Sequence, residues 1–280
     1  MNTVLLQELI RYNNLLATMK ESLSTLLAAM KGLVLMNPDL EEVATSLANG
    51  WVPQLWRKVR WVCKAIASVP SDPHRLCFAM WCRGAQASYP SLKSLGSWIP
   101  DLLARIIFFQ DWVDHGCPPV FWISGFFFTQ SFLTGTLQDY ARSHKLSIDT
   151  ISFSFEVVHT LAEDIDSPPS DGCYVRGLFL VGCRWDSSLW ALEEPHPCQL
   201  WCPLPVLWLH PKLTQEVEKE TNSSHVLTCP VYKTSERRGQ LSTTGHSTNF
   251  VLAVKLPMSA QHTETHWVRR GVALLCQLDS

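Results

Sequence analysis

The chain has 280 residues, of which 46% are hydrophobic and 17% are charged, and its formal net charge is -2. This length is enough for one large domain or two ordinary ones. The near-neutral charge gives no reason to expect a nucleic acid or an anionic membrane as a partner. The low charged fraction suggests that another protein covers part of the surface, and the 12 tryptophans fit that interpretation because Trp is favoured at interfaces.

A helical part is predicted for residues 1–145. Its first segment carries a heptad pattern of apolar residues, which predicts one long helix over residues 3–31 that lies against a neighbouring domain. Asn37 and Pro38 predict the N-cap and first turn of a second helix that ends near Gly50. A third helix is predicted from about residue 97 to 114 with Pro100 in its first turn, and a fourth ends near His144. The positions of the heptad pattern are 5, 9, 12, 16, 19, 23, 26, 30 and 33.

Residues 116–138 form a segment without charged side chains, long enough in principle to cross a bilayer. Pro118 and Pro119 open it, and glycine, threonine, glutamine and serine interrupt it. We therefore expect a short buried strand that leads into a buried helix, and no membrane partner.

Cysteine usage predicts reduced thiols. The N-terminal sequence does not look like a signal peptide, so an oxidising compartment is not expected. None of the 10 cysteines forms a C-x-x-C pair, and Cys198 and Cys202, with His196 nearby, have no second pair at zinc-finger spacing. We therefore predict no metal ligand and no cofactor in this protein.

After Lys145 the hydrophobic pattern changes to the period of 2 that is typical of strands. The predicted fold class is α+β, with an N-terminal helical segment followed by a small antiparallel β-barrel or sandwich over residues 146–280. Residues 211–224 are predicted to form an exposed polar loop. The predicted strands cover residues 151–157, 177–181, 206–209, 227–232, 250–254 and 271–276.

The sequence contains no complete match to a known catalytic motif, so no catalytic residue is predicted. A nucleotide-binding P-loop needs a Gly-Lys pair, and the sequence contains none. The nearest match to a nucleophile elbow is residues 245–249, but Asn249 stands where the tight turn needs a small residue. A stand-alone hydrolase that uses His246 and Ser247 is therefore the weaker alternative.

Two basic segments, residues 232–239 and 267–270, admit two interpretations. Composition alone favours a solvated hairpin, and the alternative is a docking surface for an acidic partner. The candidate interface residues are Lys233, Arg237, Arg238, His246, Trp267, Arg269 and Arg270.

Four long strings, residues 121–130, 229–239, 241–250 and 266–278, resemble the C-terminal domain of dynein heavy chains, in particular the axonemal class and its inner-arm type. The resemblance extends over nearly the whole sequence. It implies a helical segment and a small β-barrel packed against the ring of AAA+ modules of a minus-end-directed microtubule motor. In that family the ATP sites and the microtubule-binding stalk lie upstream, and no catalytic residue of the family maps onto this sequence.

The implied role is to brace or regulate the AAA+ ring for ciliary or flagellar beating. The implied partners are the ring of the parent heavy chain and other dynein subunits, with microtubules contacted only indirectly. The implied location is the cytoplasm and cytoskeleton, in the axoneme of a cilium or flagellum.

The sequence departs from the family pattern between Trp56 and Ser88, where about 28 extra residues intervene, roughly residues 60–87. This atypical insert contains Cys63, Cys77 and Cys82. A zinc-dependent interaction module built on these cysteines and His74 is a third and weaker hypothesis.

Overall fold

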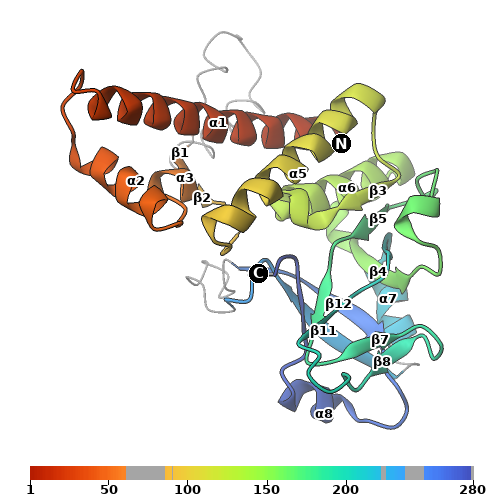
Figure 1. Ribbon diagram of the computed structural model, residues 1–280. Helices are drawn as coiled ribbons and strands as arrows, with labels where there is room; N and C mark the ends of the chain where they lie inside the picture. The colour runs from red at the N-terminus through yellow and green to blue at the C-terminus, as the bar shows by residue number, and fades with distance from the viewer. Residues whose placement is uncertain (61–85, 90, 222–224, 237–248, 279–280) are drawn as a thin grey trace. The chain divides into compact units, whose positions relative to one another are not determined.

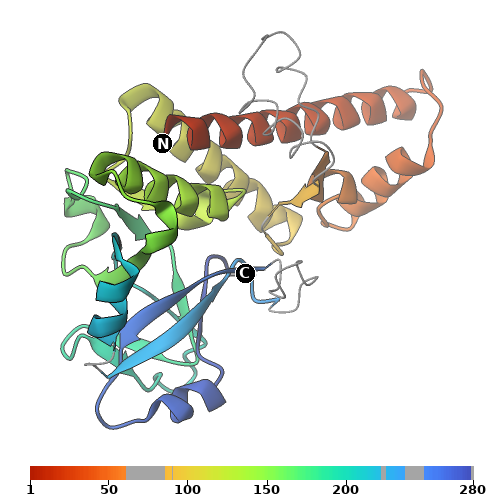
Figure 2. The same cartoon turned by 180° about the vertical axis from the view of Figure 1, so that it is seen from behind.

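The computed structural model describes residues 1–60, 86–89, 91–221, 225–236 and 249–278. Contacts between residues divide the protein into two compact units (Figures 1 and 2). We call residues 2–106 the helical unit and residues 107–278 the sheet-rich unit. The division falls within a helix, whereas the division predicted from the sequence lies at residue 145 and stays a prediction. Most of the atypical insert, with its three cysteines and His74, lies outside the described residues.

The helical unit begins with α1 (Asn2–Met30), which agrees closely with the predicted first helix. The helix α2 (Pro38–Ala48) follows, and the Asn37 side chain accepts a hydrogen bond from the Leu40 backbone N–H, as expected for an N-cap. Both views show α1 and α2 side by side after the loop that joins them (Figures 1 and 2). Leu26 packs there against Leu40 and Val43.

The buried face of α1 differs from the predicted one. Its buried residues are Val4, Glu8, Arg11, Tyr12, Leu15, Ser22 and Leu26. The heptad leucines at 16 and 23 are exposed instead, together with Met30. Polar contacts explain the difference: Glu8 and Arg11 form an ion pair, and the Trp56 indole donates a hydrogen bond to Ser22 Oγ at 3.0 Å. The inward face is selected by buried polar pairs as well as by hydrophobicity.

The ends of the insert meet in a short ribbon. After α3 (Gln54–Arg57), strand β1 (Lys58–Arg60) pairs antiparallel with β2 (Gln86–Ser88), so that Lys58 lies opposite Ser88. Arg60 and Gln86, which flank the segment between the two strands, therefore lie opposite each other. The backbone then leads through Tyr89 into the next helix.

The helix α5 (Leu95–His115) carries a second buried ion pair of the helical unit. It starts two residues earlier than predicted, so Pro100 lies in its second turn and the prediction of a first-turn position was wrong. The Arg105 Nε donates to Asp101 at 2.8 Å, and these side chains are only 1% and 6% exposed. Tyr89 donates its hydroxyl to Asp101, and the Arg105 guanidinium lies over the Tyr89 ring.

Electrostatics at this pair favour its charged form. Burial alone would raise the pKa of Asp101, but the charge and hydrogen bond of Arg105, together with Lys93, hold that pKa below its ordinary value. Burial strongly raises the pKa of Tyr12 and of Tyr89, so both phenols stay protonated.

The sheet-rich unit begins with an aromatic cluster. Phe109 and Trp112 of α5 pack on Phe121 and Phe126, and the rings of Phe126 and Phe132 lie 4.5 Å apart. Phe121 belongs to strand β3 (Val120–Trp122), and Phe132 to helix α6 (Thr129–His144). The predicted buried strand is confirmed, whereas the helix that follows it is buried on one side only. No helix in the described ranges is long and apolar enough to cross a bilayer.

The described strands of this unit form two larger sheets and one ribbon. The first sheet has the strand order β3-β5-β10-β4, the second has the order β12-β11-β13-β6-β9, and β7 pairs with β8. The bounds are β4 Ile151–Val157, β5 Cys173–Arg176, β6 Phe179–Val181, β7 Arg184–Asp186, β8 Ala191–Glu193, β9 Trp201–Pro203, β10 Leu207–Leu213, β11 Val226–Tyr232, β12 Phe250–Pro257 and β13 Ala273–Leu275.

The α+β class is confirmed. A purely antiparallel arrangement is not, since β3 pairs parallel with β5 and β11 pairs parallel with β13. Among the described strands both larger sheets are open, so the predicted barrel is not confirmed. The predicted loop at 211–224 was also wrong: β10 runs to Leu213, and α7 (Thr214–Thr221) follows, with Val217 buried.

Asp101→Asn should lower the free energy of unfolding by about 3 kcal/mol, because it leaves a buried guanidinium without its counter-charge. The control Asp111→Asn, on the exposed side of the same helix, should change it by less than about 0.5 kcal/mol. Denaturant titration followed by circular dichroism measures both.

The sign of the pH dependence follows from the lowered pKa of Asp101. Its contribution is present above the ordinary carboxyl pKa of about 3.9 and is lost as the pH falls through the lowered value. The stability difference between wild type and Asp101→Asn should therefore be full near neutral pH and shrink in acid. A difference that does not change with pH would contradict this explanation.

Gly172→Ala should destabilise the protein by more than about 2 kcal/mol. Gly172 has a φ of +77°, and an added Cβ would lie 2.0 Å from the Leu209 carbonyl oxygen. Gly96→Ala, in α5, meets no atom within 4 Å and should stabilise the protein by about 0.5–1 kcal/mol. Thermal unfolding of the two variants should therefore shift in opposite directions.

Candidate functional site

The second basic segment, residues 267–270, forms the C-terminal part of helix α8 (Glu264–Arg269) and its C-cap Arg270. Trp267, one of the candidate interface residues, is 0% exposed in this helix. Its indole is buried in the core beneath α8, and a role of Trp267 in an interface stays a prediction. Arg269 and Arg270 are exposed on the same short element.

Arg270 is already engaged by groups of its own unit. Its Nη1 lies 2.6 Å from Glu194 Oε2, and its Nε donates to the Gly182 carbonyl oxygen at 3.3 Å. The side chain thus joins α8 to the segment after β8. An acidic partner would have to compete with Glu194 for Arg270, whereas Arg269 projects into solvent.

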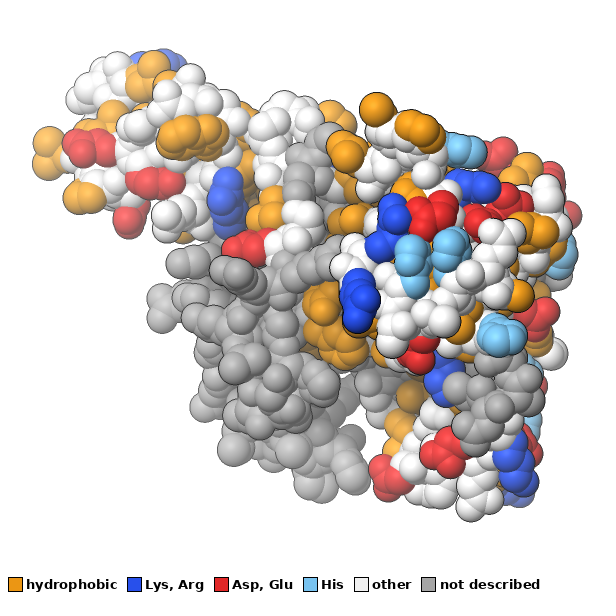
Figure 3. Space-filling model, turned by 90° about the horizontal axis from the view of Figure 1, so that it is seen from below, with side chains coloured by type: hydrophobic (Ala, Val, Ile, Leu, Met, Phe, Trp, Pro, Cys, Tyr) orange, Lys and Arg blue, Asp and Glu red, His pale blue; other side chains and the backbone are white. Residues whose placement is uncertain are grey.

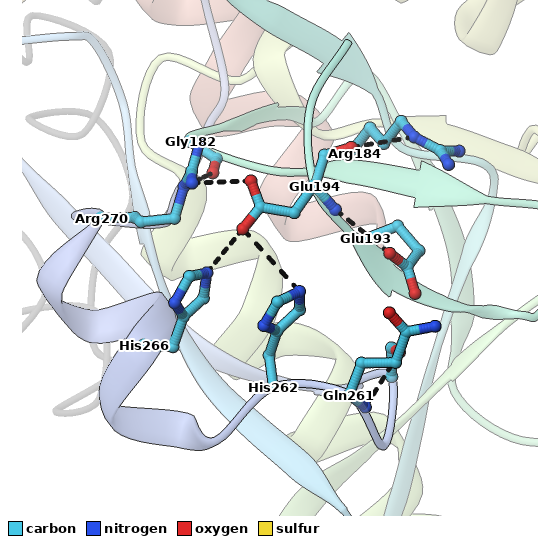
Figure 4. A network of polar contacts seen from close by, with 9 residues as sticks. Gly182, Arg184, Glu193, Glu194, Gln261, His262, His266 and Arg270 are labelled. Atoms are coloured by element: carbon cyan, nitrogen blue, oxygen red, sulfur yellow. Dashed lines mark hydrogen bonds and ion pairs between the residues drawn. The ribbon is translucent and has the colours of Figure 1, made fainter.

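Glu194 is the centre of a polar cluster (Figure 4). His266 Nε2 lies 2.6 Å from Glu194 Oε1, and His262 Nε2 lies 3.8 Å from the same oxygen. The two imidazole rings stack with centroids 4.3 Å apart and an interplanar angle of 12°. One ligand atom from each of the three residues can be chosen so that all lie within 4.8 Å of one another. Two imidazoles and a carboxylate so placed can exchange protons or bind a cation.

This cluster was not predicted from the sequence. Glu194 follows β8, whereas His266 lies 72 positions later in the sequence. The only local signal was the spacing of four between His262 and His266, which is weak without a third ligand. A parallel bridge between Leu192 and Met258, with the Ser259 N–H donating to the Leu192 carbonyl oxygen at 3.3 Å, brings the two segments together.

The first basic segment is described only at its start. Lys233 follows β11 and is partly buried, with its ammonium 5.8 Å from the centroid of the Phe128 ring. This is a cation–π contact within the unit. The candidates Arg237, Arg238 and His246 lie outside the described residues, as does Ser247 of the hydrolase alternative.

The described cysteines are free thiols, and the predicted reduced compartment stays a prediction. Burial is the main cause that raises the pKa of Cys173 and of Cys183 to about 12 in each case. Such thiols are poor nucleophiles and poor metal ligands, since both roles need the thiolate. Cys198 is exposed, and Cys202 is partly exposed.

Iodoacetamide should therefore modify Cys198 at least about 100-fold faster than Cys173 or Cys183 in the folded protein. Peptide mass spectrometry after short labelling times measures each site separately. Unfolding in denaturant should make the rates similar. Equal rates in the folded protein would show that the two buried thiols are accessible.

Comparison with known proteins shows which family this sequence belongs to. The family model for the C-terminal domain of dynein heavy chains matches residues 1–276. The protein is 47% identical over 279 residues to dynein axonemal heavy chain 1 of Mus musculus and 48% identical over 282 residues to dynein axonemal heavy chain 3 of the same species. It is 45% identical to dynein axonemal heavy chain 12 of Rattus norvegicus.

These alignments cover 100% of this protein but only 6%, 6% and 8% of the respective relatives. The 280 residues thus correspond to the C-terminal domain of those relatives and not to their AAA ATPase region, and they are non-catalytic by family. The protein belongs to the family formed by the C-terminal domains of dynein heavy chains, and its similar relatives are axonemal dynein heavy chains.

Proposed function

We propose that this protein is the part of an axonemal dynein heavy chain that braces and regulates the AAA+ ring of the motor. The motor is an ATP-driven, minus-end-directed one that drives ciliary or flagellar beating. The proposed partners are the ring of the parent heavy chain and other dynein subunits, with microtubules contacted only through the rest of the motor. The proposed location is the axoneme, within the cytoskeleton.

The observation that carries this proposal is the uncovered apolar side of α1. Large apolar side chains on this side of the helix are exposed to solvent: Leu6 and Leu27 are 59% and 58% exposed. The following loop exposes Leu33, Val34, Leu35 and Met36 as well. Contiguous exposed apolar surface marks a protein interaction site in a soluble protein. A large partner domain that covers α1 would account for it.

The sequence supports a non-enzymatic role for this region. It contains no Gly-Lys pair and hence no P-loop lysine motif. In the proposed arrangement ATP is hydrolysed elsewhere in the heavy chain, and this region acts on the ring through contacts alone. The purified protein should therefore show no magnesium-dependent ATP turnover above a buffer control.

The double variant Leu6→Gln with Leu27→Gln should weaken binding of this protein to the ring by at least about tenfold. The probe is the AAA+ region of the mouse axonemal heavy chain 1 expressed without its own C-terminal domain, and the assay is biolayer interferometry. Gln preserves the helix propensity of α1, so circular dichroism should show an unchanged fold.

Leu161→Gln is the matched control, because Leu161 is 70% exposed but belongs to the sheet-rich unit. It should leave the affinity for the ring unchanged. Equal affinity of wild type and the α1 double variant would show that the apolar side of α1 does not contact the ring. ATP turnover by the purified protein would contradict the non-enzymatic role itself.

A further inference from the structure

We propose that Glu194, His262 and His266 form a site for a divalent transition-metal ion, with zinc as the best-fitting ion. The site lies on the surface of the sheet-rich unit around α8. Figure 3 shows histidine side chains beside acidic and basic ones on the face that is seen from below. The proposal concerns this unit alone and does not depend on the proposed contact of α1 with the ring.

The spacing of the three side chains suits tetrahedral coordination. Ligand atoms that each lie about 2.0–2.1 Å from a zinc ion at tetrahedral angles are about 3.4 Å from one another. The two distances to Glu194 Oε1, 2.6 Å from His266 and 3.8 Å from His262, lie on either side of that value. Small side-chain rotations would make them equal. Both imidazoles already direct Nε2 at the same carboxylate oxygen (Figure 4).

The ligand set selects the class of ion. Imidazole nitrogen suits zinc, copper and nickel, whereas magnesium and calcium prefer sites made of oxygen atoms alone. Two histidines and one glutamate with a fourth position left to water is a recurrent arrangement for zinc. The side chains of His262, His266 and Glu194 are 26%, 34% and 38% exposed, so solvent can supply the fourth ligand.

The surrounding contacts hold the three residues in place. Arg184 Nε donates to the Glu194 carbonyl oxygen at 3.0 Å, which fixes the backbone after β8. Arg270 holds Glu194 Oε2 and leaves Oε1 directed at the histidines. Trp267 is fully buried and anchors α8, which begins two residues after His262. Groups that orient a metal ligand from behind in this way raise metal affinity.

The local charges admit a cation. Arg270 opposes it, although Arg270 is paired with the oxygen of Glu194 that the histidines do not contact. The neighbouring Glu193 is 9% exposed, and its buried Oε1 has no hydrogen-bond partner among the described residues. Glu193 therefore adds a second acidic side chain next to Glu194 in the sequence. The alternative is that the cluster is an ion-pair network that needs no metal, and the experiment separates the two.

The test is a titration of the 280-residue protein, stripped with a chelator and with its accessible thiols alkylated by iodoacetamide. Isothermal titration with zinc should give one ion per molecule. Titration with cobalt should give the visible bands of tetrahedral cobalt without the near-ultraviolet charge-transfer band of a thiolate ligand. Magnesium and calcium should not compete at similar concentrations.

His262→Ala and Glu194→Gln should each weaken zinc binding by more than the roughly 10–100-fold that loss of an outer-shell group causes. His225→Ala is the control, because His225 is an exposed histidine outside the cluster. It should bind zinc as the wild type does. Circular dichroism confirms that each variant is folded, and His262→Ala removes a side chain whose described contacts all lie within the cluster and with Trp267.

The proposal is overturned if the wild-type protein binds no zinc at a one-to-one ratio, which would leave an ion-pair network. It is also overturned if His262→Ala and Glu194→Gln bind zinc as tightly as His225→Ala. Neither result would bear on binding of the ring by α1, since Leu6 and Leu27 lie in the other unit.

Discussion

The helical unit depends on the buried guanidinium of Arg105 and the groups that surround it. Arg105 is 0% exposed, and an unpaired guanidinium in that position would be far too costly for a marginally stable fold. Its partner Asp101 is on the same helix, but the phenols of Tyr12 and Tyr89 come from elsewhere in the sequence. These groups must therefore assemble together. The requirement fixes which side of α1 faces α5 and draws Glu8 and Arg11 inward with Tyr12.

This constraint explains the uncovered leucines of α1. Only one side of a helix can pack against its own unit. In α1 the polar contacts of Glu8, Arg11 and Ser22 determine which side that is. The leucines of the heptad pattern then remain outside, where they would be a liability in an isolated protein. In a large assembly the same side becomes a surface for a neighbouring domain. The orientation of α1 thus links the interior of this unit to the proposed contact with the ring.

Much of the local structure could be predicted from the sequence because its determinants are local. The heptad pattern gives the bounds of α1, Asn37 caps α2, and the alternation in residues 151–157 gives β4. Long similar strings were enough to recognise the family. The buried face of α1 was missed, since hydrophobic periodicity does not register a buried Glu8–Arg11 pair.

Features that depend on tertiary contacts were not predictable in this way. The parallel pairing of β11 with β13 and the helix α7 within an expected loop have no clear local pattern. Trp267 lies in a basic segment, and that pattern does not reveal that its indole is buried in the core. The cluster around Glu194 requires the ribbon of β7 and β8 to meet α8, which spacing along the sequence does not reveal.

The ribbon of β1 and β2 has a consequence for how this region can vary. Because Arg60 lies opposite Gln86, the two ends of the intervening segment are held at one place whatever its length. The entropy of closing a loop grows only slowly as the loop lengthens. A change in the length of this segment would therefore leave the positions of α1, α2 and α5 within the helical unit unchanged. At this ribbon, related proteins can therefore differ in the length of the segment between the two strands while they keep the same fold.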